Sequence, residues 1–158
     1  MIMYKLKGYS YITIVEIPRA EIQIFDIVTC ANPRETLGNF YSRQSVKPDF
    51  LMNAGFFNMS NGDPTFTFID EGVTLAREDW VSTGIGIVNN ELKYGNINDY
   101  QWKDFVSGFP CLIADYKPLD ISGAQVLNYK TRRSALGFND TTLFLITVDT
   151  PGAKFEQL

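Results

Sequence analysis

The sequence contains no histidine among its 158 residues. Histidine is the commonest general base and the commonest metal ligand in proteins, so its absence excludes Ser–His and Cys–His nucleophile systems. Any acid–base chemistry in this chain therefore falls to carboxylates, lysine, tyrosine or cysteine.

Cysteine is also scarce, with only Cys30 and Cys111, which lie far apart and form no CxxC pair. A zinc site or a thioredoxin-like motif therefore has no support, and a disulfide between the two stays open. Because clustered ligands of other kinds are not visible in the sequence, we predict no metal and no cofactor.

The chain lacks a long apolar run and a basic cluster. No run approaches the roughly 20 residues that span a membrane, and lysines and a glycine interrupt Met1–Tyr11, which does not resemble a signal peptide. The 14 lysines and arginines are scattered and the net charge is −4, which argues against nucleic acid as a partner. We therefore expect a soluble protein, cytoplasmic or virion-associated, that binds neither membrane nor nucleic acid.

The residues that are present favour strands. Hydrophobic residues make up 45% and aromatic residues 14% of the chain, which indicates a single strand-rich domain over residues 1–158. The predicted fold class is α+β and mostly β, a mixed or antiparallel twisted sheet with a few flanking helices. Strand patterns cover Tyr9–Ile17, Glu21–Val28, Phe50–Ala54, Thr65–Ile69 and Phe109–Ala114, and hairpins are expected around Asn89-Asn90 and Asn139-Asp140.

Two segments carry helix-start signals. Asn32, followed by Pro33 and Glu35, predicts a short helix through about Ser42. Thr150-Pro151 predicts a C-terminal helix over Gly152–Leu158, which we interpret as the start of an element whose partner segment lies elsewhere.

The segment Asn53–Asn58 has the composition of a binding loop. Small residues let the backbone approach a ligand, two phenylalanines offer walls, and two carboxamides offer donors and acceptors. The competing interpretation is a strand end with a glycine turn and core aromatics.

Charged residues stand at the ends of two predicted strands. Arg132 and Arg133 begin one strand and so point to opposite faces, where an inward guanidinium suits a phosphate or a carboxylate. An edge-strand charge or a structural salt bridge is the alternative. Asp149 ends an apolar strand and is equally suited to catalysis or to capping a helix.

In order and spacing these segments resemble the phosphodiester glycosidase family, the uncovering-enzyme type that removes N-acetylglucosamine from a phosphodiester. Its members carry an Asn-Gly/Ala-Gly-Phe-Phe-Asp/Asn block, a Ser/Gly-Gly-x-Pro-x-Leu-Ile/Val block, an Arg-Thr/Ser-Ala-Ile/Leu-Gly block and a Leu-Ile-Thr-Val-Asp strand. The corresponding residues here are Asn53–Asn58, Ser107–Ile113, Arg133–Gly137 and Leu145–Asp149.

The resemblance implies a hydrolase that cleaves a sugar-1-phosphodiester bond of a glycan or wall polymer without a cofactor. Arg133 would clamp the phosphate, Asn53 would position the sugar or the phosphate, and Asp149 would supply the catalytic carboxylate. Substrate contacts are expected from Gly55, Phe56, Phe57, Asn58, Ser107, Gly108, Pro110 and Arg132.

The family also carries an Asn-Leu-Asp-Gly-Gly-Gly-Ser block after this strand, and this sequence does not contain it. A C-terminal segment that supplies the block is therefore an expected partner. The main alternative function is a non-catalytic carbohydrate- or wall-polymer-binding module, bacterial or part of a phage particle. A structural domain whose glycines shape tight turns is the third.

Overall fold

The structure is a computed structural model that describes residues 1–28, 35–58, 60–79, 81–122 and 129–154. The chain divides into two compact units. Unit 1 contains Met1–Glu21 and Phe109–Leu158, and unit 2 contains Ile22–Gly108. Each unit has its own antiparallel sheet.

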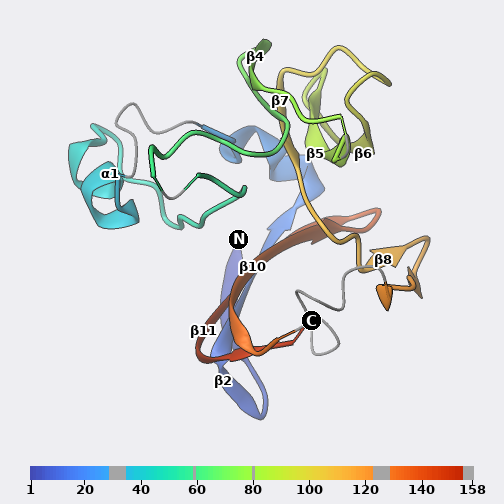
Figure 1. Cartoon of the computed structure of the whole chain (residues 1–158). Coiled ribbons are helices and arrows are strands. Elements are labelled where there is room, and N and C mark those ends of the chain that lie inside the picture. Colours follow the sequence, from blue (N-terminus) through green and yellow to red (C-terminus); the bar gives the residue numbers. More distant parts are fainter. Residues whose placement is uncertain (29–34, 59, 80, 123–128, 155–158) are drawn as a thin grey trace. The chain divides into compact units, whose positions relative to one another are not determined.

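Unit 1 is built on a four-stranded sheet with the order β1-β2-β11-β10 (Figure 1). Its strands are β1 (Ile2–Leu6), β2 (Tyr9–Pro18), β10 (Thr131–Phe138) and β11 (Thr142–Ala153). A small second sheet pairs β8 (Ile113–Ala114) with β9 (Lys117–Pro118).

The central strands β2 and β11 are apolar on both faces. Val15 lies opposite Leu145, and Ile12 lies opposite Val148. All four residues are buried, and alternation along a strand puts the two pairs on opposite faces. The apolar stretch Leu143–Val148 thus lies in a central strand.

The hairpin of β10 and β11 is also confirmed, with its turn at Asn139. The Asn139 carboxamide oxygen accepts hydrogen bonds from the backbone N–H groups of Thr141 and Thr142, at 2.9 and 2.8 Å. Such local bonds from side chain to backbone are the reason that asparagine favours turns.

Unit 2 is built on a five-stranded sheet with the order β4-β3-β7-β5-β6. The strands are β3 (Phe68–Asp70), β4 (Val73–Ala76), β5 (Thr83–Val88), β6 (Glu91–Asn96) and β7 (Asp104–Ser107). The predicted hairpin at Asn89-Asn90 is confirmed, because both asparagines adopt positive φ, 52° and 62°, as a two-residue link of this type requires.

Helix is limited, within the described residues, to the 3-10 helix η1 (Arg19–Ile24) and to α1 (Leu37–Arg43). The prediction of a mostly β fold with a few helices is confirmed. Neither helix has the length and apolar character needed to cross a membrane.

Two glycines allow β5 to approach β7 closely. A Cβ atom at Gly86 would lie 2.2 Å from the carbonyl oxygen of Asp104 and 2.7 Å from the ring of Trp102. A Cβ atom at Gly84 would lie 2.1 Å from the carbonyl oxygen of Val106. Pairing of these strands therefore depends on the absence of a side chain at both positions.

Two predicted strands are wrong. The segment Glu21–Val28 begins inside η1, which buries Ile22, and the rest of it is irregular. Phe50–Ala54 is irregular as well. Near-alternation of apolar residues predicted the first strand, and an apolar run predicted the second. A strand also needs a neighbour to complete its hydrogen bonds, and no described strand pairs with either segment.

Two other predicted strands are shorter than expected. Of Thr65–Ile69, only the last two residues belong to β3, and the Thr67 hydroxyl before it exchanges hydrogen bonds with the backbone of Glu78 at 3.2 and 3.0 Å. Of Phe109–Ala114, only Ile113–Ala114 is a strand.

The predicted first helix is present but begins later. Thr36 caps α1, and its hydroxyl oxygen accepts a hydrogen bond from the backbone N–H of Asn39 at 3.2 Å. The predicted cap and first turn, Asn32–Arg34, lie outside the described residues.

The predicted C-terminal helix is wrong in its described part. Strand β11 continues through Thr150 and Pro151 to Ala153, which pairs with Thr131. Gly152 has φ 87°, which a right-handed helix does not allow. Residues 155–158 lie outside the described part of the chain.

Candidate functional site

Arg133 and Asp149 lie at the same end of the β10–β11 ladder in unit 1. Arg133 pairs with Val148, and the next pair joins Thr131 to Ala153. On β10 only Arg132 separates these pairs, whereas β11 has residues 149–152 between them. Strand β11 therefore bulges beside Arg132 and Arg133, and such bulges are common next to active sites.

The guanidinium of Arg133 is oriented by backbone carbonyls. Its Nε donates to the carbonyl oxygen of Ala153 at 3.0 Å, and its Nη2 donates to that of Tyr129 at 2.7 Å. These two bonds orient the guanidinium. Burial lowers the pKa of Arg133, so the charged form is partly desolvated and an anion would be favoured beside it.

The remaining residues of this ladder end are exposed. Arg132 is exposed while Arg133 is half-buried, as alternation along a strand predicts. Asp149 is exposed, and its Oδ1 accepts a hydrogen bond from the Thr150 N–H at 2.7 Å. The helix-cap interpretation of Asp149 no longer applies, because the residues after it continue β11.

The segment Asn53–Asn58 belongs to unit 2 and passes beside β7. A Cβ atom at Gly55 would lie 3.5 Å from Cγ2 of Val106. The Asn58 carboxamide oxygen accepts hydrogen bonds from the N–H and the hydroxyl of Ser60, at 2.8 and 2.7 Å. The predicted ligand role of this oxygen of Asn58 is therefore unsupported, because the oxygen stabilises a turn.

Ser107 is buried at the end of β7. Its side chain is 1% exposed, and its hydroxyl has no hydrogen-bond partner among the described residues. Its N–H donates to the carbonyl oxygen of Thr67 at 2.9 Å. Gly108, which follows, is exposed, and Pro110 in unit 1 is half-buried.

Two groupings of the predicted site residues follow. Arg132, Arg133 and Asp149 lie together in unit 1, and the segment Asn53–Asn58 lies beside β7 in unit 2. Convergence of Asn53 with Arg133 and Asp149 stays a prediction, because they belong to different units.

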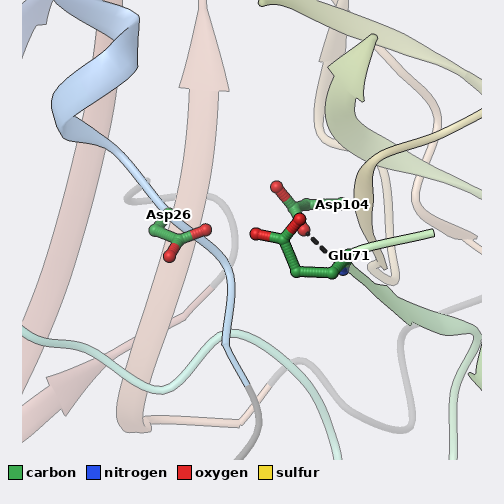
Figure 2. Close-up of side chains that lie close together, drawn as sticks. All are labelled: Asp26, Glu71 and Asp104. Carbon is green, nitrogen blue, oxygen red and sulfur yellow. Dashed lines mark hydrogen bonds between the residues drawn. The ribbon is translucent and has the colours of Figure 1, made fainter. Parts of the chain in front are cut away.

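A group of carboxylates in unit 2 was not predicted from the sequence. Figure 2 shows Asp26 after η1, Glu71 in the β3–β4 turn and Asp104 at the start of β7. Their oxygen atoms lie within 4.8 Å of one another. One local feature of the sequence could have indicated the group: Asp104 is the acidic first residue of the mainly apolar segment Asp104–Ser107. A carboxylate in such a segment is typically buried together with a partner.

Lys103 forms ion pairs with two of the three carboxylates. Its Nζ lies 3.0 Å from Glu71 Oε1 and 3.1 Å from Asp104 Oδ2. Asp104 is fully buried, and its Oδ1 accepts a hydrogen bond from the Glu71 N–H at 3.0 Å. Oδ2 accepts no well-aligned hydrogen bond, but an ion pair needs no alignment, so we regard Lys103 as its partner.

The carboxylate group holds the β3–β4 turn against β7. Contacts of its ammonium with the carboxylates of Glu71 and then Asp104 raise the pKa of Lys103. The ammonium thus stands where a metal cation would bind two of the three carboxylates, and we assign no metal to the group.

Asp26 is expected to make stability depend on pH. Burial, then repulsion from Asp104, raises the pKa of Asp26 above its ordinary 3.8. The folded chain therefore binds this proton more tightly than the unfolded chain, and the resulting stabilisation is lost as the pH rises through the folded pKa. Asp26→Asn should raise the melting temperature near pH 7, by at most about 2 °C because the side chain is exposed.

Melting curves at about pH 4 and pH 7 check this expectation, because the gain should shrink at the lower pH. A melting temperature for Asp26→Asn below that of the native chain at neutral pH would show that the carboxylate is stabilising there.

Comparisons with known proteins found no match: no family model, no curated protein and no solved structure is similar to this chain. The function is therefore argued from the chain's own segments and their geometry.

Proposed function

We propose that the chain is a hydrolase that cleaves the bond between the anomeric carbon of a sugar and a phosphodiester oxygen. The observation that carries this proposal is the β10–β11 pairing, in which Arg133 lies opposite Val148, the residue before Asp149. An oriented guanidinium and an exposed carboxylate thus lie at one end of a strand pair.

A phosphate leaving group suits a site without histidine. The carbon–oxygen bond breaks with its electron pair moving to the phosphate oxygen, so strong protonation of the leaving group is less necessary than in ordinary glycoside hydrolysis. Arg133 would donate hydrogen bonds to the departing phosphate and offset its growing negative charge.

Asp149 is the proposed carboxylate. Its negative charge would stabilise the positive charge that develops at the anomeric carbon. The oxygen of a water molecule then bonds to that carbon, and one proton of the water passes to Asp149. Asn53 would orient the sugar or the phosphate through its carboxamide. The products are the free sugar and a phosphate monoester.

Asp149→Asn tests the proposal, with Asp140→Asn as the matched control, because Asp140 is an exposed carboxylate in the turn of the same hairpin. Turnover of a sugar-1-phosphodiester by the full-length protein should fall about 100-fold in the first variant and less than about twofold in the second. Release of free sugar over time gives both rates. Equal rates in the two variants would remove Asp149 from the mechanism.

A carbohydrate-binding module without catalysis is the second candidate. The exposure of Phe56 and Phe57, 50% and 42%, favours it, because exposed aromatic rings are frequent in binding surfaces. This candidate predicts that the native protein binds a sugar phosphodiester and releases no sugar from it. Turnover above the uncatalysed rate would exclude it.

A further inference from the structure

We infer that the end of the unit 1 sheet that carries Arg133 and Asp149 binds a polyanionic chain in which phosphodiesters join neutral sugars. This inference rests on the phosphodiester ligand proposed above and adds the class of substrate, a polymer with many phosphates. It uses residues of unit 1 alone.

Strand pairing gathers the cations of this sheet at one end, although they are scattered along the sequence. The β1–β2 turn, the end of β11 and the start of β10 lie together, because Ile12 pairs with Val148 and Val148 pairs with Arg133 (Figure 1). Among the described residues of the four strands and their turns, this end has one acidic residue, Asp149, and six cations. The cations are Lys5, Lys7, Lys130, Arg132, Arg133 and Lys154.

The opposite end of the same sheet is acidic. Glu16 lies on β2 opposite Phe144, and Asp140 lies in the β10–β11 turn. Arg19 and Glu21 of η1 follow β2 at this end, and their charges offset each other. The sheet is therefore polarised along its strands, and a negatively charged ligand is attracted to the end with the lysines.

Several cations of this end have no counterion within the described part of the chain. Lys7, Lys130 and Arg132 are exposed and form no ion pair with a described residue. Lys5 Nζ donates a hydrogen bond to the neutral hydroxyl of Thr13 at 2.6 Å. Because gathered like charges repel one another, this arrangement favours the binding of an external anion.

The width of this end fits a chain with several phosphates. In the order β1-β2-β11-β10, the two edge strands are three strand spacings apart, which is about 14 Å. One phosphate beside Arg133 on β10 has no need of the lysines near β1. The successive phosphates of a polymer use cations across the whole width, so the polymer accounts for Lys5 and Lys7 as well.

Asp149 favours a chain whose charges are separated by neutral sugars. It is exposed and lies on β11, between the lysines near β1 and the cations of β10. A nucleic acid carries a phosphate on every nucleotide, so a strand that crosses this end brings phosphates close to the carboxylate. A polymer of sugar phosphates can place a neutral ring there, and we therefore favour it over nucleic acid.

Binding of a labelled polymer of N-acetylglucosamine 1-phosphate to the full-length protein tests the inference, by fluorescence anisotropy read in the first seconds after mixing. Lys7→Gln and Lys130→Gln should each weaken binding about threefold and lower the salt dependence by about one released counterion. Lys117→Gln is the matched control, because Lys117 is an exposed lysine of unit 1 on β9, outside the four-stranded sheet. It should change binding less than about 1.5-fold.

Two further ligands test the class of substrate. Monomeric N-acetylglucosamine 1-phosphate should bind the native and Lys7→Gln chains equally, because one phosphate does not need Lys7. Oligothymidine with as many phosphates as the polymer should bind the native chain at least about tenfold more weakly. Equal affinity for oligothymidine and the polymer would overturn the inference.

The outcomes separate this inference from the proposed hydrolase. Polymer binding that depends on Lys7 and Lys130, without release of sugar, supports the polyanion site and contradicts the hydrolase. Release of sugar from the polymer, with an affinity that neither Lys7→Gln nor Lys130→Gln changes, contradicts the polyanion site and supports the hydrolase.

Discussion

Replacing Arg133 with alanine is expected to lower the turnover of a sugar-1-phosphodiester about 1000-fold, because the departing phosphate loses a charged donor. The effect should appear mainly in kcat, since the phosphate carries its extra negative charge in the transition state. Lys117→Ala, which removes an exposed cation of β9 in the same unit, should change turnover by less than about threefold.

Arg133 also has a structural role that the experiment must separate from catalysis. Its bonds to the carbonyl oxygens of Ala153 and Tyr129 are lost in the alanine variant, which should cost about 1 to 3 kcal/mol of stability. Added guanidinium ion should restore part of the lost turnover if the missing group acts on the phosphate. A variant that melts above the assay temperature, has low activity and shows no such rescue would reduce Arg133 to a structural residue.

Replacing Gly86 with alanine should destabilise unit 2 by about 3 kcal/mol or more, because the new methyl group overlaps a neighbouring strand. The Cβ position lies 2.2 Å from the carbonyl oxygen of Asp104 and 2.7 Å from the Trp102 ring. The backbone of β7 cannot move aside without breaking its pairing with β3. Urea unfolding followed by tryptophan fluorescence measures the effect.

Gly137→Ala is the control for this variant. Gly137 is also a strand glycine, but nothing lies within 4 Å of its Cβ position. Alanine there should be neutral, or should stabilise by up to about 1 kcal/mol by restricting the unfolded chain. Equal urea midpoints for the two variants would mean that β5 and β7 are not as close as the structure has them.

The elements that the sequence predicts well are the two hairpins. The residue pairs Asn89-Asn90 and Asn139-Asp140 each specify their turn within two to four residues. The first does so through positive φ, and the second through hydrogen bonds from side chain to backbone. Such information lies in the turn itself. The predicted strand at Glu21–Val28 depended on near-alternation of apolar residues, and the one at Phe50–Ala54 depended on an apolar run. Neither pattern supplies a pairing partner.

The tertiary structure also decides how the residues around Asp149 are arranged. The family resemblance related Arg133 and Asp149, and the structure places both at the same end of one hairpin. The interpretation of Thr150-Pro151 as a helix start failed because the cap and proline signals are weak compared with the pairing of Ala153 with Thr131. The residues after Asp149 do not by themselves indicate that pairing.

The sequence by itself limited the chemistry open to this protein: without histidine, any acid–base step falls to carboxylates, lysine, tyrosine or cysteine. It also determined where the chain turns, because turn signals act between neighbours. Only the tertiary structure decided that Lys103 forms ion pairs with Glu71 and Asp104 beside Asp26, and that β11 continues through the expected helix start. These outcomes depend on strand pairing between distant segments, and no local preference of the residues specifies which segments meet.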